Sequence, residues 1–219
     1  MDLKTKRKKE LFEQKERRKD EVISAAVEVF KEKGIENSKM TDIAEKAEVG
    51  VASVYRYFKT KPDLAVEVAI KFWDMEINSI YTEFDKDNIN NLIGIEKLKT
   101  ILNVFVNLYN NHKDFVRFLE EFDNYVIKEQ IPSEKLENYE KSIINLKNII
   151  FEALEEGKVD GSIRSDIDNE VFYITVSHSL MTLAQKLILR GNILKSDSDV
   201  SGESQINLII DMAVNYIQN

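Results

Sequence analysis

The stretch MTDIAEKAEVGVASVYRYFKTKPDL, residues 40–64, decides the fold. Apolar residues at helical spacing predict one short helix over about residues 40–47 and a second over about residues 51–58. Residues 48–50 (Glu-Val-Gly) leave room only for a tight turn between them. Two short helices joined by such a turn form the helix-turn-helix arrangement.

Longer helices flank this motif. Val22, Ala26 and Val29 recur at i, i+4 and i+7, which predicts an amphipathic helix that ends at Gly34. Ser38 is the expected N-cap of the first motif helix. After the motif, Pro62 stands in the first turn of a long helix, where its missing N–H costs nothing.

Two apolar faces distinguish the helix that begins at about residue 62. Leu64, Val68 and Phe72 line one face, and Trp73 and Ile77 line another. A helix that is apolar on two sides contacts two bodies. We therefore expect this helix to connect the motif with the rest of the chain.

The composition predicts a helical protein. Its 219 residues include seven Gly and two Pro, so few tight turns are available. The absence of Cys excludes a disulfide scaffold, a cysteine nucleophile and thiolate metal ligation. Only His112 and His178 could supply a nitrogen ligand, so we expect no metal and no cofactor. The expected fold is all-α, with about nine helices.

Charge divides the chain into two expected domains. Residues 1–61 carry a net charge of +4 and residues 62–219 a net charge of −12. A basic head on an acidic body is typical of a DNA-binding module attached to a larger domain that does not bind DNA. No apolar run of about 7 to 15 residues follows the charged N-terminus, so we expect no secretory signal or membrane span and a cytoplasmic protein.

The N-terminal arm has two interpretations. Between Lys4 and Lys19 it carries nine basic and three acidic residues. It could follow the phosphate backbone or enter the minor groove of DNA. It could equally be a solvated tail.

The body contains further helical patterns. One covers Leu98–Tyr109, a second Phe115–Val126, and a third begins at Pro132 and ends near Gly157. In the last two, 171–189 and 206–217, apolar residues occupy more than the roughly 100° that one core contact uses, which favours a homodimer. The expected interface residues are Leu180, Ala184, Leu187, Ile188, Leu208, Met212 and Tyr216.

Residues 40–64 resemble the DNA-binding motif of the TetR (tetracycline repressor) family of transcriptional regulators. The resemblance is carried by Ile43-Ala44, Ala47, Val49, Val54-Tyr55, Tyr57-Phe58, Lys61 and Leu64. It implies DNA-backbone contacts for Tyr57 and Lys61, and a backbone or base contact for Thr41. Glu48 departs from the pattern, because it stands where the family usually has Gly; it would need a positive φ.

The second motif helix has the residues of a DNA-reading helix. Val51, Ala52 and Ser53 are small enough for close approach to base edges, and Arg56 can bind a guanine edge or a phosphate. Tyr55 would face DNA as well, although the tyrosines and Phe58 could instead form only a core cluster.

The resemblance also implies a small-molecule pocket in the body. The candidate lining residues project from different helices and are Trp73, Phe105, Tyr109, Phe118, Phe122 and His178. His178 has a competing interpretation as a hydrogen-bonded core histidine.

The predicted function is a ligand-responsive transcriptional regulator, expected to be a repressor, that binds double-stranded operator DNA as a homodimer and releases it on binding an unidentified small molecule. A hydrolase that uses His178 with Ser177 or Ser179 is excluded, because neighbouring residues on a helix do not face each other. The alternative is a helical adaptor that binds protein rather than DNA. It would have no use for Ser53 and Arg56 at this spacing.

Overall fold

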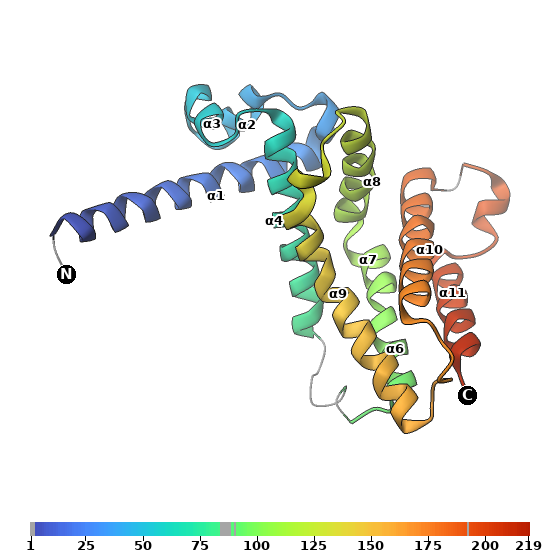
Figure 1. The fold of residues 1–219 in the computed structure, drawn as a ribbon. Coiled ribbons are helices and arrows are strands. Elements are labelled where there is room, and N and C mark those ends of the chain that lie inside the picture. Colours follow the sequence, from blue (N-terminus) through green and yellow to red (C-terminus); the bar gives the residue numbers. More distant parts are fainter. Residues whose placement is uncertain (1–2, 84–88, 90, 192) are drawn as a thin grey trace. The chain divides into compact units, whose positions relative to one another are not determined.

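The fold is all-α, as the composition predicts. The computed structural model describes residues 3–83, 89, 91–191 and 193–219 (Figure 1). These residues form helices, together with one isolated antiparallel bridge between Ile163 and Gln218. None of the helices in the described ranges is long and apolar enough to cross a lipid bilayer.

The N-terminal helices form the predicted helix-turn-helix. Helix α1 spans Leu3–Asn37, α2 spans Met40–Lys46, α3 spans Val51–Tyr57 and α4 spans Lys61–Glu83. Their shared core contains Val22, Phe30, Ile43 and Val54, each at most 3% exposed. Glu48, in the turn between α2 and α3, has a φ of 53°. The positive φ predicted for it is therefore confirmed.

The start of α2 differs from the prediction. Lys39, not Ser38, occupies the N-cap, and its backbone N–H donates to the Asp42 carboxylate at 2.9 Å. Ser38 is buried, and its hydroxyl donates to the Gly34 carbonyl at 2.6 Å. The Ser38 hydroxyl therefore hydrogen-bonds the backbone of the bend before α2 and does not cap α2.

The basic arm is helical and continuous with α1. The expected end of that helix at Gly34 appears as a kink, with φ 75° and ψ 161°. A Cβ on Gly34 would lie 2.9 Å from the Glu121 carboxylate, and a positive φ suits glycine. Glycine at position 34 therefore permits both the bend and the close approach of Glu121.

The rest of the chain is helical, with two departures from the sequence pattern. The bounds are α6 Gly94–Leu102, α7 Val104–Asn111, α8 Lys113–Lys128, α9 Ser133–Asp160, α10 Asn169–Arg190, the 3₁₀ helix η1 Lys195–Ser198 and α11 Gly202–Ile217. The single helix predicted over Leu98–Tyr109 is interrupted at Asn103. Helix α9 does not stop at Gly157 but continues to Asp160.

Gly157 stays helical because of a close contact with α6. A Cβ added at Gly94 would lie 2.1 Å from the Gly157 backbone nitrogen. Two glycines thus let the backbones of α6 and α9 approach each other directly. Asp160, the last residue of α9, fastens the same junction by accepting the Gly94 N–H at 2.7 Å. The glycine signals a close helix contact at this point rather than a helix end.

The contacts divide the chain into two compact units, whose bounds differ from the predicted 1–61 and 62–219. The first unit extends to Phe72 and includes Glu121–Tyr139; the second comprises Trp73–Glu120 and Glu140–Asn219. Helices α4, α8 and α9 each contribute residues to both units. On α4, the buried Leu64, Val68 and Phe72 belong to the first unit, and Trp73 and Ile77 to the second.

Candidate nucleic-acid interface

Helix α3 buries one side and exposes the other. Val54 is fully buried and Phe58, at the C-cap, is 2% exposed. Val51 and Tyr55 are 36% and 49% exposed, so they lie on the opposite side. A half-exposed Tyr55 is not part of a core cluster, and the core interpretation is wrong for this residue.

The remaining predicted DNA contacts lie on or near the same exposed surface. Ala52, Arg56 and Thr41 are exposed, and Ser53 and Tyr57 are partly buried. Arg56 lies 5.3 Å from the centre of the Tyr57 ring, and its Nη2 donates to the Tyr57 hydroxyl at 3.5 Å. This stacking orients the guanidinium before any DNA is bound, which reduces the entropy lost when it pairs with a base or phosphate.

Lys61, for which the resemblance implies a phosphate contact, also contacts residues of its own unit. Its amino group donates to the Glu36 carbonyl at 3.1 Å and lies 5.5 Å from the centre of the Tyr125 ring. Partial burial lowers the pKa of Lys61, partly offset by the negative charges of Glu36 and Glu129. The Lys61 amino group thus makes contacts within the first unit, and the phosphate contact that the resemblance implies stays a prediction.

Helix α8 holds the bend between α1 and α2. The Glu121 carboxylate accepts the Ile35 backbone N–H at 2.9 Å. Lys128 pairs with Glu36 at 2.7 Å, a contact that raises the pKa of Lys128. The sequence pattern does not indicate these contacts, because partners about 90 residues apart share no local spacing. Glu121 therefore supports the helix-turn-helix domain from α8.

Comparisons with known proteins agree with this geometry. Residues 22–68 match the domain family described as "Bacterial regulatory proteins, tetR family". Residues 22–68 therefore form a regulatory domain of the TetR family. TetR regulators are not enzymes, so the prediction of a DNA-binding transcriptional regulator rather than an enzyme is confirmed.

The similarity to known regulators extends beyond residues 22–68. The HTH-type transcriptional regulator LuxR of Vibrio harveyi is 29% identical over 147 residues, covering 65% of this chain and 67% of LuxR. The HTH-type transcriptional repressor KstR2 of Mycolicibacterium smegmatis is 25% identical over 157 residues, which cover 71% of this chain and 72% of KstR2. The structure of FadR from Bacillus subtilis in complex with stearoyl-CoA has the same fold, with a TM-score of 0.63 and 20% sequence identity. The match covers 90% of this chain and 98% of the FadR chain.

The six residues predicted for a TetR effector pocket do not share one environment. Trp73, Phe105 and Phe118 are buried in the second unit, where Trp73 packs edge-on against Phe115 with 5.5 Å between ring centres. Phe122 belongs to the first unit and packs against Tyr139. His178 is exposed on α10, so its interpretation as a core histidine is wrong.

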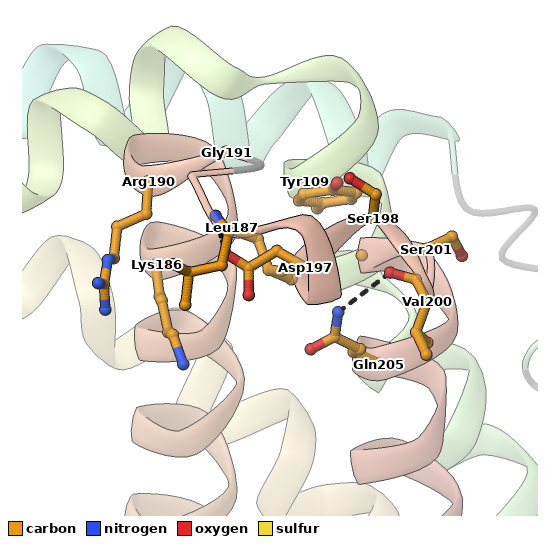
Figure 2. A pocket seen from close by; sticks show the side chains of 12 residues that line it. Tyr109, Lys186, Leu187, Arg190, Gly191, Asp197, Ser198, Val200, Ser201 and Gln205 are labelled. Carbon is orange, nitrogen blue, oxygen red and sulfur yellow. Dashed lines mark hydrogen bonds between the residues drawn. The ribbon is translucent and has the colours of Figure 1, made fainter.

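Tyr109 lines a cavity of about 360 Å³ in the second unit (Figure 2). Leu187, Leu194 and Val200 contribute apolar surface, and Lys186 and Arg190 contribute cationic side chains. The other lining residues come from the α10–α11 connection and the start of α11: Gly191, Asp197, Ser198, Ser201, Gly202 and Gln205. The cavity is suited to a ligand with an apolar part and a negative charge.

The predicted dimer residues lie in two environments. Leu208, Met212 and Tyr216 are 58–64% exposed on one face of α11. On α10, however, the predicted residues pack inward: Leu180, Ala184 and Ile188 are buried and Leu187 is partly buried. The prediction used the wrong face of α10, because the pattern of an all-round apolar helix does not say which side meets its own chain.

The exposed face of α10 is also apolar in part. Val171 and Ile174 are exposed, and Val171 lines a groove of about 610 Å³ with Met212 and Tyr216 of α11. His178 lies on the same side of α10, seven residues after Val171.

Proposed function

We propose that this TetR regulator represses transcription in the cytoplasm by binding a two-fold operator as a homodimer, and that a small-molecule effector releases the DNA. The observation that carries the proposal is the exposed face of α3, where Val51, Tyr55 and the oriented Arg56 are available to base edges. The competing adaptor function provides no reason for this face.

A second copy of the chain is the proposed occupant of the α10–α11 groove. Exposed Val171, Met212 and Tyr216 line the groove, and Ile174 and Leu208 are further exposed apolar residues of the same two helices. A surface that presents the same residues on two copies can pair with itself around a two-fold axis. Binding of such a dimer to a two-fold operator requires the two copies of α3 to lie on successive major grooves, about 34 Å apart.

DNA binding is tested by selecting duplexes from a random pool and measuring the affinity of the best sequence. We expect Arg56→Ala to weaken the selected site by about 1 to 3 kcal/mol more than random DNA if Arg56 reads a base. The matched control is Arg117→Gln, an exposed arginine on α8. A protein that selects no sequence would overturn the proposed function.

The proposed effector is an amphipathic anion of the long-chain acyl-CoA class. Support comes from the cavity of Figure 2, whose lining includes the apolar Leu187 and Val200 and the cationic Lys186 and Arg190. Neither cation forms an ion pair within the described part of the chain, although the body is strongly acidic. The similarly folded FadR binds stearoyl-CoA.

Stearoyl-CoA, coenzyme A and stearate are the probes for this effector class. We expect stearoyl-CoA to bind most tightly and to weaken operator binding by about 5- to 150-fold, the usual range of coupling between two sites. Operator DNA must weaken stearoyl-CoA binding by the same factor. Arg190→Gln should weaken stearoyl-CoA but leave operator affinity unchanged in its absence. Stearoyl-CoA binding that operator DNA leaves unchanged would contradict this effector class.

A further inference from the structure

The N-terminal part of α1, residues 3–19 and here called the arm, extends beyond the core of the first unit. The first fully buried residue of α1 is Val22, and residues 5–18 are all exposed. Some of its charges neutralise one another by i,i+4 ion pairs, namely Lys6–Glu10, Lys9–Glu13 and Arg17–Glu21. Four other cations form no ion pair with any described residue: Arg7, Lys8, Lys15 and Arg18.

The free cations share one side of the helix. Lys8, Lys15 and Arg18 are separated by seven and three residues, and Arg7 adjoins them. At about 100° per residue, all four fall within roughly 100° of the helix circumference. The three ion pairs lie on the opposite side. The arm therefore has one neutralised face and one free cationic face.

The free cationic face is on the side of α1 that packs against the helix-turn-helix. The spacing continues from Arg18 to the buried Val22 and then to Val29, so a single stripe is cationic in the arm and apolar in the core. Lys19 marks the transition. Its amino group lies 2.9 Å from Glu67 and 5.6 Å from the centre of the Phe58 ring, at the C-cap of α3. The arm thus leaves the core beside the end of the DNA-reading helix.

We propose that the free cationic face of the arm binds the phosphate backbone of DNA that flanks the operator half-site. Lys8 lies 14 residues before Val22, or about 21 Å along a helix, which corresponds to about six base pairs. Phosphate contacts of this kind add affinity without reading sequence. The inference rests on the proposed DNA-binding function and adds a second contact surface to it.

An anionic membrane surface is the competing partner of a basic helix. The apolar residues near the cationic face are Leu11 and Phe12, which are 59% and 63% exposed. An interfacial helix needs a broad apolar face along its length. An apolar surface of only Leu11 and Phe12 near the cationic face, together with the exit of the arm beside α3, favours DNA.

The test uses two duplexes, one limited to the selected operator and one with ten added base pairs on each side. The variant Lys8→Gln/Lys15→Gln/Arg18→Gln removes three of the four free cations. Its matched control, Lys6→Gln/Lys9→Gln/Arg17→Gln, removes the same charge from the ion-paired face. Circular dichroism verifies that both variants retain the helical content of the unmodified protein.

We expect the unmodified protein to bind the long duplex more tightly and with a steeper salt dependence than the short one. The free-face variant should lose most of this difference, with the slope of log K against log salt becoming shallower by about 0.9 per lost contact. The paired-face variant should retain most of it. All three proteins should bind the short duplex with similar affinity.

Each contrary outcome overturns a distinct statement. If the unmodified protein fails to bind the short duplex, the proposed DNA-binding function is wrong. If the short duplex binds but flanks add nothing, or if both variants lose the flank effect equally, the arm has no DNA-binding face. The third outcome concerns vesicles of phosphatidylcholine and phosphatidylserine (4:1). If flanking DNA adds no affinity and only the free-face variant loses binding to these vesicles, the face binds membranes instead of DNA.

Discussion

The amino group of Lys61, at the start of α4, lies 5.5 Å from the centre of the Tyr125 ring in α8. Desolvation and the nearby charges of Glu129 and Glu36 raise the pKa of Tyr125 to about 12, so its neutral ring faces the lysine at physiological pH. The same amino group donates to the Glu36 carbonyl. Lys61 thereby joins α4, α8 and the end of α1 within one compact unit.

This arrangement predicts a structural role for Lys61. Lys61→Gln removes a hydrogen bond and a cation–π contact, which together should lower the free energy of unfolding by about 1 kcal/mol. The salt dependence of operator binding should stay unchanged, because no phosphate contact is lost. Urea unfolding and a salt titration measure both effects, with the exposed Lys59→Gln as control. If the slope of log K against log salt instead becomes shallower by about 0.9 in Lys61→Gln, Lys61 contacts a DNA phosphate.

The crossing of α6 and α9 should tolerate no side chain at Gly94. A Cβ there would meet the Gly157 backbone at 2.1 Å, so Gly94→Ala must separate the helices and should cost about 3 kcal/mol or more. Gly50→Ala is the matched control, because nothing lies within 4 Å of its added Cβ. Thermal unfolding of both variants gives the comparison. Equal melting temperatures would show that the crossing can relax.

Asp160 should make the second unit sensitive to acid. Hydrogen bonds lower the pKa of Asp160 below its usual 3.8. The largest effect comes from the Gly94 N–H, and the Ser162 hydroxyl and N–H contribute less. A carboxylate whose pKa is lower in the folded state stabilises the fold above the unfolded pKa, and this contribution is lost as the pH falls through the folded pKa.

Asp160→Asn should therefore reduce stability at pH 7 and flatten the loss of stability below about pH 4. Urea unfolding at pH 7, 4 and 3 measures this. Asp199→Asn is the control, because Asp199 is exposed on the α10–α11 connection. Parallel pH curves for Asp160→Asn and the unmodified protein would mean that these hydrogen bonds do not perturb the carboxylate.

A charge on the exposed face of α11 should abolish the proposed dimer. Met212 is 58% exposed beside the α10–α11 groove, and Met212→Glu would bury an unpaired carboxylate in a two-fold interface. We expect monomers in sedimentation experiments and loss of binding to a two-fold operator. Met75→Glu, a change at an exposed methionine of α4, should remain dimeric. A dimeric Met212→Glu protein would move the interface elsewhere.

The sequence by itself determined the helical class and the helix-turn-helix. These features depend on local spacing, scarce turn residues and a turn too short for other geometries. It also separated Val54 and Phe58 from the exposed positions of α3, because a short amphipathic helix has one face to bury.

Only the tertiary structure decided features that depend on partners distant in sequence. The Lys61 amino group contacts Glu36 and Tyr125, and Gly157 lies at a close contact between two helices and not at a helix end. The apolar pattern of α10 was equally compatible with either face turned inward, and packing buried Leu180 and Ala184. Local periodicity states that a face is apolar, but the burial of that face depends on which other segment covers it.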